Sequence, residues 1–473
     1  MREDEGPVIG LEIHIQLSTS TKLFCPCPID PSAEPNTLTC PVCLGHPGSL
    51  PVMNREALKA GVMLGIALGA DIKRKTIFYR KNYFYPDLAK GYQITQHSSQ
   101  IASGGHLEFL CDGEKSVRIT GIAIEEEAAR TVYTEDGHAL LDFNRSGIPL
   151  LEVITEPDLR SASEAKAFLE ALRLIVRYLG ISEGDMEKGQ MRVDTNVSYV
   201  LDGIQGNRVE LKNINTFKAV QDAIIYEAER QRKLLTEGKP VPRETRAWDE
   251  YIGGSVSMRL KEVASDYRFF PEPDLQPLVF DEAFLAEVAA AVPELPEVRY
   301  RRYIEEYGLA GQTARALVST RELSDYFDTV AERVKDKKRA GNFVAVELVG
   351  AMRARNEAIT GFPVKAPDLA ELLLAVDDGR LTLSGAKAAF AKAIEEGRPP
   401  LEIAGEEGLF SGSGEDELVA WIDEVLAAHP DEVERFRGGK EGVIGFLVGQ
   451  VMKRSGGRVD PKRVREIMIE RIR

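Results

Sequence analysis

The chain has 473 residues, enough for two to four domains, and it is acidic, with 75 Asp and Glu against 60 Lys and Arg. The formal charge of −15 argues against binding of nucleic acid over the whole surface. The first residues resemble no signal peptide, and no stretch reaches the ~20 consecutive apolar residues of a membrane span, so we expect a cytoplasmic protein with no membrane partner.

The predicted elements begin with a strand at residues 8–17, VIGLEIHIQL, in which apolar and polar residues alternate. Glu12 and His14 fall on its polar face. Because residues two apart in a strand point the same way, these two side chains project together, ~7 Å apart along the strand. The polar face of this strand is therefore a candidate site.

Four of the five cysteines follow within nineteen residues, as the pairs Cys25 and Cys27, then Cys40 and Cys43. Two short pairs separated by a loop are typical of a tetrathiolate zinc site. Disulfide bonds are the alternative, but they need an oxidising compartment, which the expected location does not provide. We predict a structural zinc ion, because four thiolates leave no open coordination position.

Further predicted strands place carboxylates within apolar segments. One strand ends in Glu125, Glu126 and Glu127, and another, PLLEVIT, holds Glu152 among apolar neighbours. A carboxylate in such a strand is costly unless it is paired or bound to a metal. Carboxylates together with one histidine suit a hard cation such as magnesium, which often bridges phosphates.

Later strands and two helices complete the first predicted domain. The strand MRVDTNVSYV, at 191–200, carries Asp194 on its polar face, and helices are predicted at 161–180 and 216–235. Strands joined by turns, with helices set apart, predict an α+β domain built on a largely antiparallel sheet. The candidate phosphate-binding side chains along these strands are Arg145, Lys212, Arg259 and Arg268.

After the proline-rich segment 269–280 the strand pattern stops and helical periodicity takes over. From Arg435 to Arg473, eleven Lys and Arg stand against four Asp and Glu. A basic tail on an acidic body favours a nucleic-acid partner, although a solvated helix face is the alternative. The residues that we predict to contact nucleic acid, around a Ser-Gly-Gly turn between two helices, are Lys453, Arg454, Gly456, Gly457 and Arg458.

Long strings of this sequence resemble the GatB family, the B subunits of glutamine-dependent aspartyl/glutamyl-tRNA(Asn/Gln) amidotransferases. These strings run nearly end to end: GLEIHIQL, RKNYFYPDLAKGYQITQ, DFNRSGIPLLEVITEPD, RVDTNVS, VELKNINTF, ETRAWDE, SDYRFFPEPDL and GKEGVIGFLVGQVMKRSGGRVDP. The resemblance implies a cradle domain related in fold to glutamine synthetase at 1–292, a helical domain at 293–405 and a YqeY-like, tRNA-binding tail at 406–473.

The resemblance also implies a carbon–nitrogen ligase reaction. The cradle would use ATP and magnesium to phosphorylate the side-chain carboxylate of Asp or Glu mischarged on tRNA(Asn) or tRNA(Gln). Ammonia released from glutamine by an A subunit would then displace the phosphate, with A and C subunits as partners. The sequence leaves open which mischarged tRNA is used, and whether a non-discriminating aminoacyl-tRNA synthetase joins the complex.

Carried over position by position, the resemblance implies the catalytic residues Glu12, His14, Glu125, Glu152 and Asp194. It implies magnesium ligands at His14, Glu125 and Glu152, and it places Lys81, Lys90 and Asp194 along an ammonia route.

The segment AIEEEAAR, at 123–130, departs from the family's pattern His-x-Glu-Glu-Asp-Ala-Gly-Lys. This departure leaves open which of Glu125, Glu126 and Glu127 binds magnesium. Two hypotheses from other classes remain: a non-catalytic tRNA-binding scaffold, and a free-standing ATP-dependent amide ligase. ATP-dependent phosphate release would distinguish the amidotransferase subunit from a non-catalytic scaffold. A requirement for the A subunit would distinguish it from a free-standing ligase.

Overall fold

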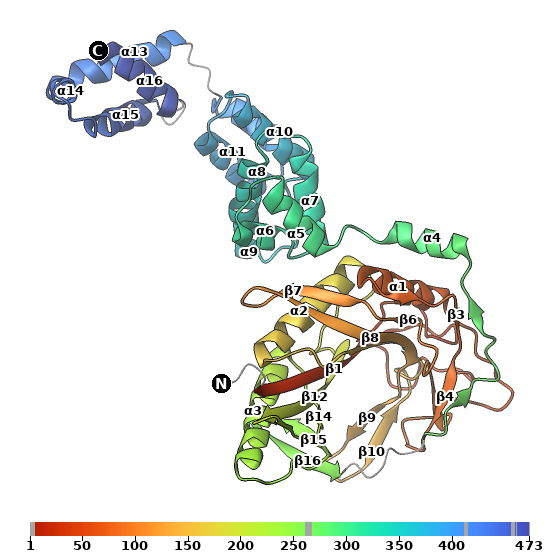
Figure 1. The fold of residues 1–473 in the computed structure, drawn as a ribbon. Coiled ribbons are helices and arrows are strands. Elements are labelled where there is room, and N and C mark those ends of the chain that lie inside the picture. The colour runs from red at the N-terminus through yellow and green to blue at the C-terminus, as the bar shows by residue number, and fades with distance from the viewer. Residues whose placement is uncertain (1–4, 261–266, 411–414, 456–458, 460, 473) are drawn as a thin grey trace. The chain divides into compact units, whose positions relative to one another are not determined.

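The computed structural model describes residues 5–260, 267–410, 415–455, 459 and 461–472. The chain divides into two compact units, Met1–Glu297 and Val298–Arg473, which we describe separately (Figure 1). Among the described residues, no helix has both the length and the apolar character needed to cross a lipid bilayer.

One large sheet forms the body of the first unit. Its strands are β1 (Gly6–Gln16), β2 (Asp71–Ile72), β6 (Ala102–Ser103), β7 (His106–Leu110), β8 (Glu114–Glu126), β11 (Pro149–Thr155), β12 (Met191–Leu201), β13 (Ile204–Gln205), β14 (Val209–Lys212), β15 (Glu244–Asp249) and β16 (Gly254–Leu260). They run in the order β16-β15-β14-β12-β1-β11-β8-β6-β2, with β13 beside β12 and β7 beside β8. Within the described residues its strands pair antiparallel, except that β14 and β15 are parallel. The predicted α+β class with a largely antiparallel sheet is confirmed.

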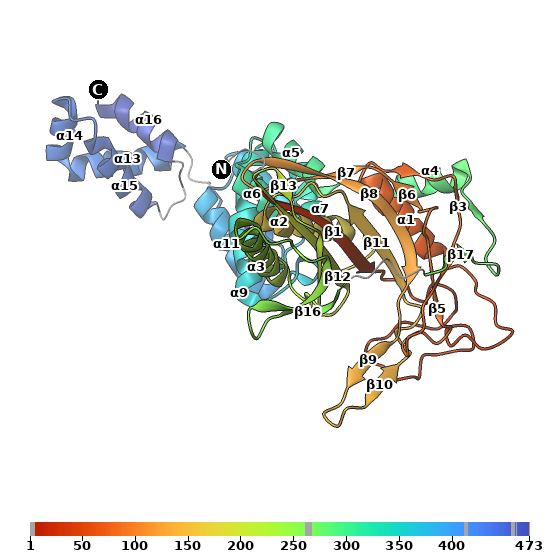
Figure 2. The ribbon, with the colours of Figure 1, turned by 60° about the horizontal axis from the view of Figure 1, so that its bottom comes forward.

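Smaller pairings flank this sheet. They use β3 (Lys75–Thr76), β4 (Tyr79–Asn82), β5 (Tyr92–Thr95), β9 (Arg130–Tyr133), β10 (Ala139–Asp142), β17 (Phe270–Pro271) and β18 (Leu278–Val279). β17, β4 and β5 form a three-stranded sheet, and β18 pairs with β3. The β9–β10 hairpin projects away from the large sheet (Figure 2).

Helices cover the apolar face of the large sheet and leave its polar face open. These helices are α1 (Arg55–Ala67), α2 (Ala162–Tyr178) and α3 (Phe217–Thr236), and α4 (Glu282–Ala291) packs on α1. In β1, Ile13 and Ile15 are fully buried in this core, whereas Glu12 and His14 alternate with them on the half-exposed side. The predicted alternation of this strand is therefore confirmed, and it directs the polar side chains away from the helices.

The second unit is helical, and its described part contains no strand longer than an isolated bridge. Its helices are α5 (Pro296–Glu305), α6 (Gly311–Leu317), α7 (Arg321–Ala331), α8 (Lys337–Phe343), a π-helix (Val344–Leu348), α9 (Val349–Arg355), a 3₁₀-helix (Ile359–Gly361), α10 (Ala366–Asp377), α11 (Leu383–Glu396), α12 (Pro400–Glu406), α13 (Glu415–Ala428), α14 (Pro430–Arg437), α15 (Val443–Arg454) and α16 (Pro461–Ile472). Two separate hydrophobic cores hold them, one including Phe327 and Phe390, the other including Leu447 and Met468. The domain boundaries at 292/293 and 405/406 stay predictions.

Candidate functional site

Three adjacent strands bring one histidine and three carboxylates together. Nε2 of His14 in β1 lies 3.3 Å from Oε1 of Glu125 in β8. The same nitrogen lies 3.7 Å from Oε1 of Glu152 in β11 and 3.9 Å from Oε1 of Glu12. The register of β1 and β11, which sets His14 directly opposite Glu152, produces this cluster. We call these four residues the carboxylate cluster.

The electrostatics of the carboxylate cluster favour a bound cation. Burial, together with the neighbouring carboxylates of Glu125 and Glu12, raises the pKa of Glu152 to about 9. The ligand atoms of Glu12, His14 and Glu152 all lie within 4.8 Å of one another. Because carboxylate oxygens and one imidazole can coordinate a hard divalent cation, such an ion would offset the repulsion among these acids.

The structure separates the three consecutive glutamates that the sequence left as alternatives. Glu125 belongs to the carboxylate cluster, whereas the carboxylate of Glu126 forms an ion pair with Lys90. Glu127 forms an ion pair with Arg192, at 2.5 Å. Successive strand residues point to opposite faces, so Glu126 points away from Glu125. Glu127 follows the end of β8 and lines the same cavity as Glu125, but its carboxylate is held by Arg192. Of the three, Glu125 is therefore the one placed to bind a cation at this cluster.

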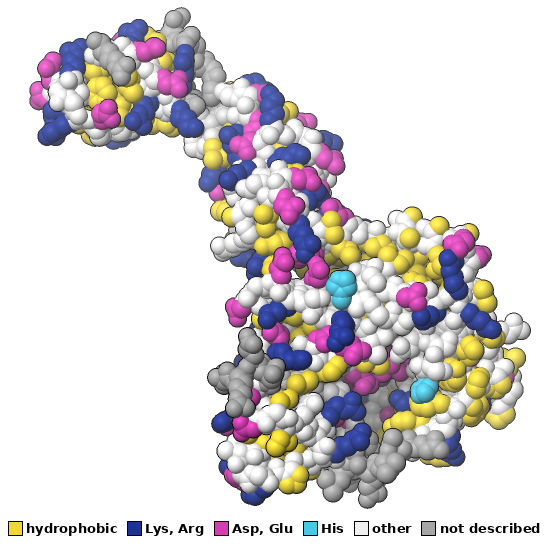
Figure 3. Space-filling view, in the orientation of Figure 1, with side chains coloured by type: hydrophobic (Ala, Val, Ile, Leu, Met, Phe, Trp, Pro, Cys, Tyr) yellow, Lys and Arg dark blue, Asp and Glu magenta, His cyan; other side chains and the backbone are white. Residues whose placement is uncertain are grey.

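An open cavity of about 430 Å³ adjoins the carboxylate cluster. Its charged and amide-bearing lining residues are Glu12, His14, Lys81, Asp87, Gln93, Glu125, Glu127, Arg192, Asp194, Lys212, Asn213 and Asn215. Figure 3 shows Asp and Glu side chains in a hollow of the first unit, with Lys and Arg side chains beside them. Acids that can hold a cation and bases that can hold a phosphate thus line one cavity.

Asp194 joins this cavity through strand pairing. It lies opposite Glu12 in the β1–β12 register, and its carboxylate forms an ion pair with the ammonium of Lys212. Burial alone would lower the pKa of Lys212, but the Asp194 charge raises it above its usual value. Lys212 therefore stays protonated inside the cavity.

The remaining predicted phosphate-binding residues lie apart from the carboxylate cluster or are not described. Arg145 contacts Glu127, at 3.4 Å. Arg268 is exposed next to β4, where its carbonyl oxygen accepts a hydrogen bond from Nδ2 of Asn82 at 2.8 Å. The side chain of Arg259 lies outside the described residues.

Sequence reasoning missed Arg192. Its guanidinium lines the cavity and donates to both oxygens of Glu127, at 2.6 and 2.5 Å. Arg192 stands two residues before Asp194 in β12, so the alternation that singled out Asp194 places both on the same face. That alternation was the available signal.

The predicted ammonia-route residues fall at two places. Lys81 and Asp194 line the cavity beside the carboxylate cluster. Lys90 instead lines a second, smaller cavity together with Cys25 and Cys43.

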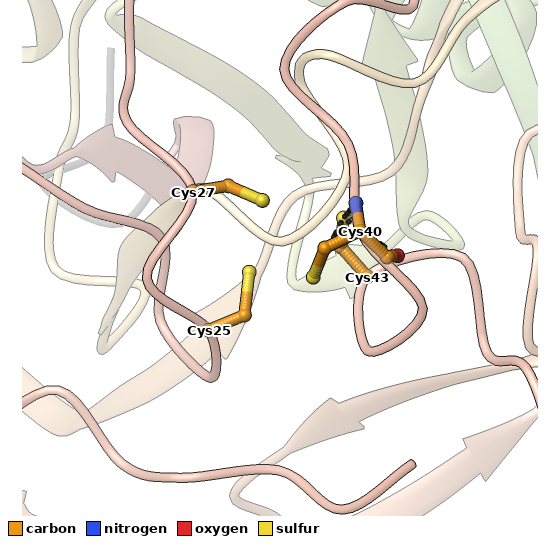
Figure 4. A group of neighbouring side chains, drawn as sticks. All are labelled: Cys25, Cys27, Cys40 and Cys43. Carbon is orange, nitrogen blue, oxygen red and sulfur yellow. Dashed lines mark hydrogen bonds between the residues drawn. The ribbon is translucent and has the colours of Figure 1, made fainter.

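The four clustered cysteines face one another from two chain segments, as Figure 4 shows. Their sulfur atoms all lie within 4.8 Å of one another, and Sγ of Cys40 and Sγ of Cys43 are 3.9 Å apart. All four thiols are free, and a disulfide would bring two sulfurs to ~2 Å. The structure therefore supports a site that can hold a metal ion, and we call residues 24–46 the cysteine knuckle.

Lys22, which sequence reasoning also missed, neutralises part of the charge of the cysteine knuckle. It is fully buried, and its ammonium donates hydrogen bonds to the carbonyl of Leu38, at 2.9 Å, and to Sγ of Cys43, at 3.6 Å. A hydrogen bond from Cys25, together with the Lys22 charge, lowers the pKa of Cys43 to about 4. The knuckle thus favours a thiolate at Cys43, which is the form that binds metals.

The described part of the basic tail exposes several cations. Lys453 and Arg454 are exposed at the end of α15, and Arg454 forms an ion pair with Glu424 of α13 at 2.6 Å. Gly456, Gly457 and Arg458 lie outside the described residues. The exposed cations of α16 are Lys462, Arg463, Arg465 and Arg471.

Comparison with known proteins identifies the family. A family model described as the GatB/GatE catalytic domain matches residues 7–286, and one described as the GatB domain matches residues 325–472. The B subunit of the aspartyl/glutamyl-tRNA(Asn/Gln) amidotransferase of Geotalea daltonii is 44% identical over 472 residues, 98% of each chain. The protein of the same name from Carboxydothermus hydrogenoformans is 42% identical, over 100% of this chain and 99% of the relative. The one from Thermotoga maritima is 43% identical, over 98% of each chain. The predicted resemblance is confirmed: the chain belongs to the family of B subunits of the aspartyl/glutamyl-tRNA(Asn/Gln) amidotransferases.

Proposed function

We propose that this chain is the subunit of an amidotransferase that activates Asp-tRNA(Asn), Glu-tRNA(Gln) or both for conversion to Asn-tRNA(Asn) and Gln-tRNA(Gln). The observation that carries the proposal is the carboxylate cluster, which adjoins a cavity also lined by Lys81, Arg192 and Lys212. Phosphoryl transfer depends mainly on positioning and on neutralising charge, and this cavity provides side chains for both.

His14, Glu125 and Glu152, with Glu12 beside them, would hold magnesium. The metal would neutralise charge on the phosphates of ATP. Lys212, which forms an ion pair with Asp194, would hold a phosphate oxygen, and Arg145, Arg259 and Arg268 are further candidate phosphate ligands.

The proposed reaction has two steps. An oxygen of the aminoacyl side-chain carboxylate attacks the γ-phosphorus of ATP, and ADP leaves with the electrons of the broken phosphoanhydride bond. Ammonia then attacks the acyl carbon, and phosphate leaves with that former carboxylate oxygen. We propose that ammonia comes from glutamine hydrolysed by an A subunit and passes Lys81, Lys90 and Asp194.

The same proposal assigns partners and a location. The relatives are named as B subunits, which supports a complex with other subunits, here an A and a C subunit. We propose that the basic tail binds tRNA around Lys453, Arg454 and residues 456–458, and that the complex works in the cytoplasm. A non-discriminating synthetase is a further candidate partner.

Copurification of this chain with its A and C subunits tests the function. We expect the complex to amidate at least one of the two mischarged tRNAs when ATP, Mg²⁺ and glutamine are present. Tight tRNA binding without ATP-dependent phosphate release would favour the scaffold hypothesis. Amidation by this chain without an A subunit, from glutamine, would favour a free-standing ligase.

We also propose that the cysteine knuckle binds one zinc ion. Four Zn–S bonds of ~2.3 Å in a tetrahedron place sulfurs ~3.8 Å apart, close to the 3.9 Å between Cys40 and Cys43. Elemental analysis of protein purified without added metal should give one zinc per chain. Cys40→Ser should lose the zinc and lower Tm by at least ~3 °C, because a structural metal contributes folding free energy. Protein without zinc, or with these thiols paired as disulfides, would contradict the assignment.

A further inference from the structure

The cysteine knuckle lies directly against Lys90. Gly45, two residues after Cys43, has a φ of +66°, and a Cβ built on it would stand 2.5 Å from Cγ and 3.1 Å from Cα of Lys90. A Cβ atom essentially never lies within 3.0 Å of another non-bonded heavy atom, so Lys90 could not keep this position beside an alanine. The aliphatic stem of Lys90 therefore lies on the bare backbone of this glycine. The turn is fixed by the N–H of Gly45, which donates to the carbonyl of Val42 at 3.1 Å.

The other cysteine-bearing segment also reaches Lys90. Phe24 directly precedes Cys25, and its ring centre lies 6.0 Å from Nζ of Lys90. Residues of both segments, including Cys25 and Cys43, line a small cavity of about 60 Å³ together with Lys90 and Glu126. A metal ion that joins the two segments would therefore fix the positions of Gly45 and Phe24, which contact the Lys90 side chain from the two segments.

Lys90 links the cysteine knuckle to strand β8 beside the carboxylate cluster. Its ammonium forms an ion pair with Glu126, and the two side chains are only 12% and 4% exposed. The Glu126 carboxylate also accepts the N–H of Ile94, at 2.8 Å. Displacing Lys90 would leave a buried carboxylate without its counter-charge, which strongly destabilises the local arrangement. Glu126 is the immediate neighbour of Glu125 in β8, so a shift of one moves the other.

We propose that the cysteine knuckle is a positioning device for the cation site, with Gly45 and Lys90 as positioning residues that hold Glu125 in place through Glu126. This inference rests on the proposed function, because it requires the carboxylate cluster to bind a divalent cation. It gives the knuckle a role in the reaction beyond its contribution to folding.

Gly45→Ala in the complex with A and C subunits tests the proposal. Gly48→Ala is the matched control, because Gly48 follows Gly45 by three residues and has a φ of +85°, but no atom lies within 4 Å of a Cβ added to it. Both variants strain the backbone, and only the first displaces Lys90. The readout is the Kd for Mn²⁺, measured by electron paramagnetic resonance without substrates, at the site whose signal Glu152→Gln removes.

We expect Gly45→Ala to weaken Mn²⁺ binding by ~10-fold or more, as loss of an outer support of a metal ligand does, and Gly48→Ala to stay within ~2-fold of the unmodified complex. Both variants should retain one zinc per chain. Equal affinities of the two variants, whether high or low, would overturn the proposal. Absence of Mn²⁺ binding in the unmodified complex would refute the cation site itself, and the inference with it.

Lys90→Met provides the second test, because it keeps an aliphatic stem and removes the charge. We expect it to weaken Mn²⁺ binding, and we expect Gly45→Ala to add at most ~2-fold in that background, since coupled residues are not additive. If the two losses multiply fully, Gly45 acts by another route than Lys90 and the proposal fails.

Discussion

Glu125→Gln and Glu152→Gln are each expected to lower ATP-dependent phosphate release from mischarged tRNA by at least ~100-fold. Both carboxylates lie within 4 Å of Nε2 of His14, and removing either charge removes a ligand from the proposed cation site. A bound metal stabilises the charge that develops during phosphoryl transfer by several kcal/mol, which corresponds to this rate loss. His14→Ala should have a smaller effect, because imidazole is a less typical ligand of magnesium.

The measurement is phosphate release by the complex at saturating ATP, with glutamine hydrolysis by the A subunit assayed in parallel. Glutamine hydrolysis should stay at least partly active, since it does not need phosphoryl transfer. Glu114→Gln is the matched control, because Glu114 lies in the same strand β8 but is exposed. A variant at Glu125 or Glu152 with normal ATP-dependent amidation would show that the residue is no metal ligand.

Removal of residues 411–473 is expected to raise the apparent KM for mischarged tRNA by at least ~10-fold. The deleted helices have their own hydrophobic core, around Ile422, Leu447 and Met468, so their loss leaves the core around Phe327 and Phe390 intact. The lost cations would otherwise bind RNA phosphates and release counterions. Glutamine hydrolysis without tRNA should change little. If the truncated complex binds tRNA as tightly as the complete complex at moderate salt, the tail does not bind tRNA and a role in subunit assembly becomes the alternative.

Charge reversal at Lys453 and Arg454 tests the same surface without a deletion. Each phosphate contact contributes ~1 to the slope of log affinity against log salt, so the double variant should flatten the slope by ~2. Reversal of Lys218 and Lys239, two exposed lysines of the first unit, controls for the change in net charge. Equal slopes for the two double variants would contradict a specific role of the tail.

The faces of the strands could be predicted from the sequence, and their pairing could not. Alternation in β1 placed Glu12 and His14 on the polar side, as the structure has them. The neighbours of β1 are β11 and β12, which are distant in sequence, and only their register sets His14 opposite Glu152 and Glu12 opposite Asp194. Alternation is a local property of a strand, whereas register depends on the whole sheet.

The ion-pair partners of buried charged side chains could not be predicted from the sequence either. Glu125, Glu126 and Glu127 differ in their partners. Glu125 lies beside His14, whereas Glu126 forms an ion pair with Lys90 and Glu127 forms one with Arg192. Lys22 gives no sequence signal at all, although its ammonium lies buried beside Cys43. Spacing predicted the four cysteines because two short pairs can reach one ion from neighbouring turns, a constraint that is local.

In the proposed reaction, the aminoacyl side-chain carboxylate is phosphorylated before it is amidated. The most direct measurement uses Asp-tRNA(Asn) or Glu-tRNA(Gln) labelled with ¹⁸O in that carboxylate, with the complete complex, ATP, Mg²⁺ and glutamine. We expect each amide formed to release one phosphate that carries one ¹⁸O from the label. Phosphate without the label, at a normal yield of amide, would contradict it.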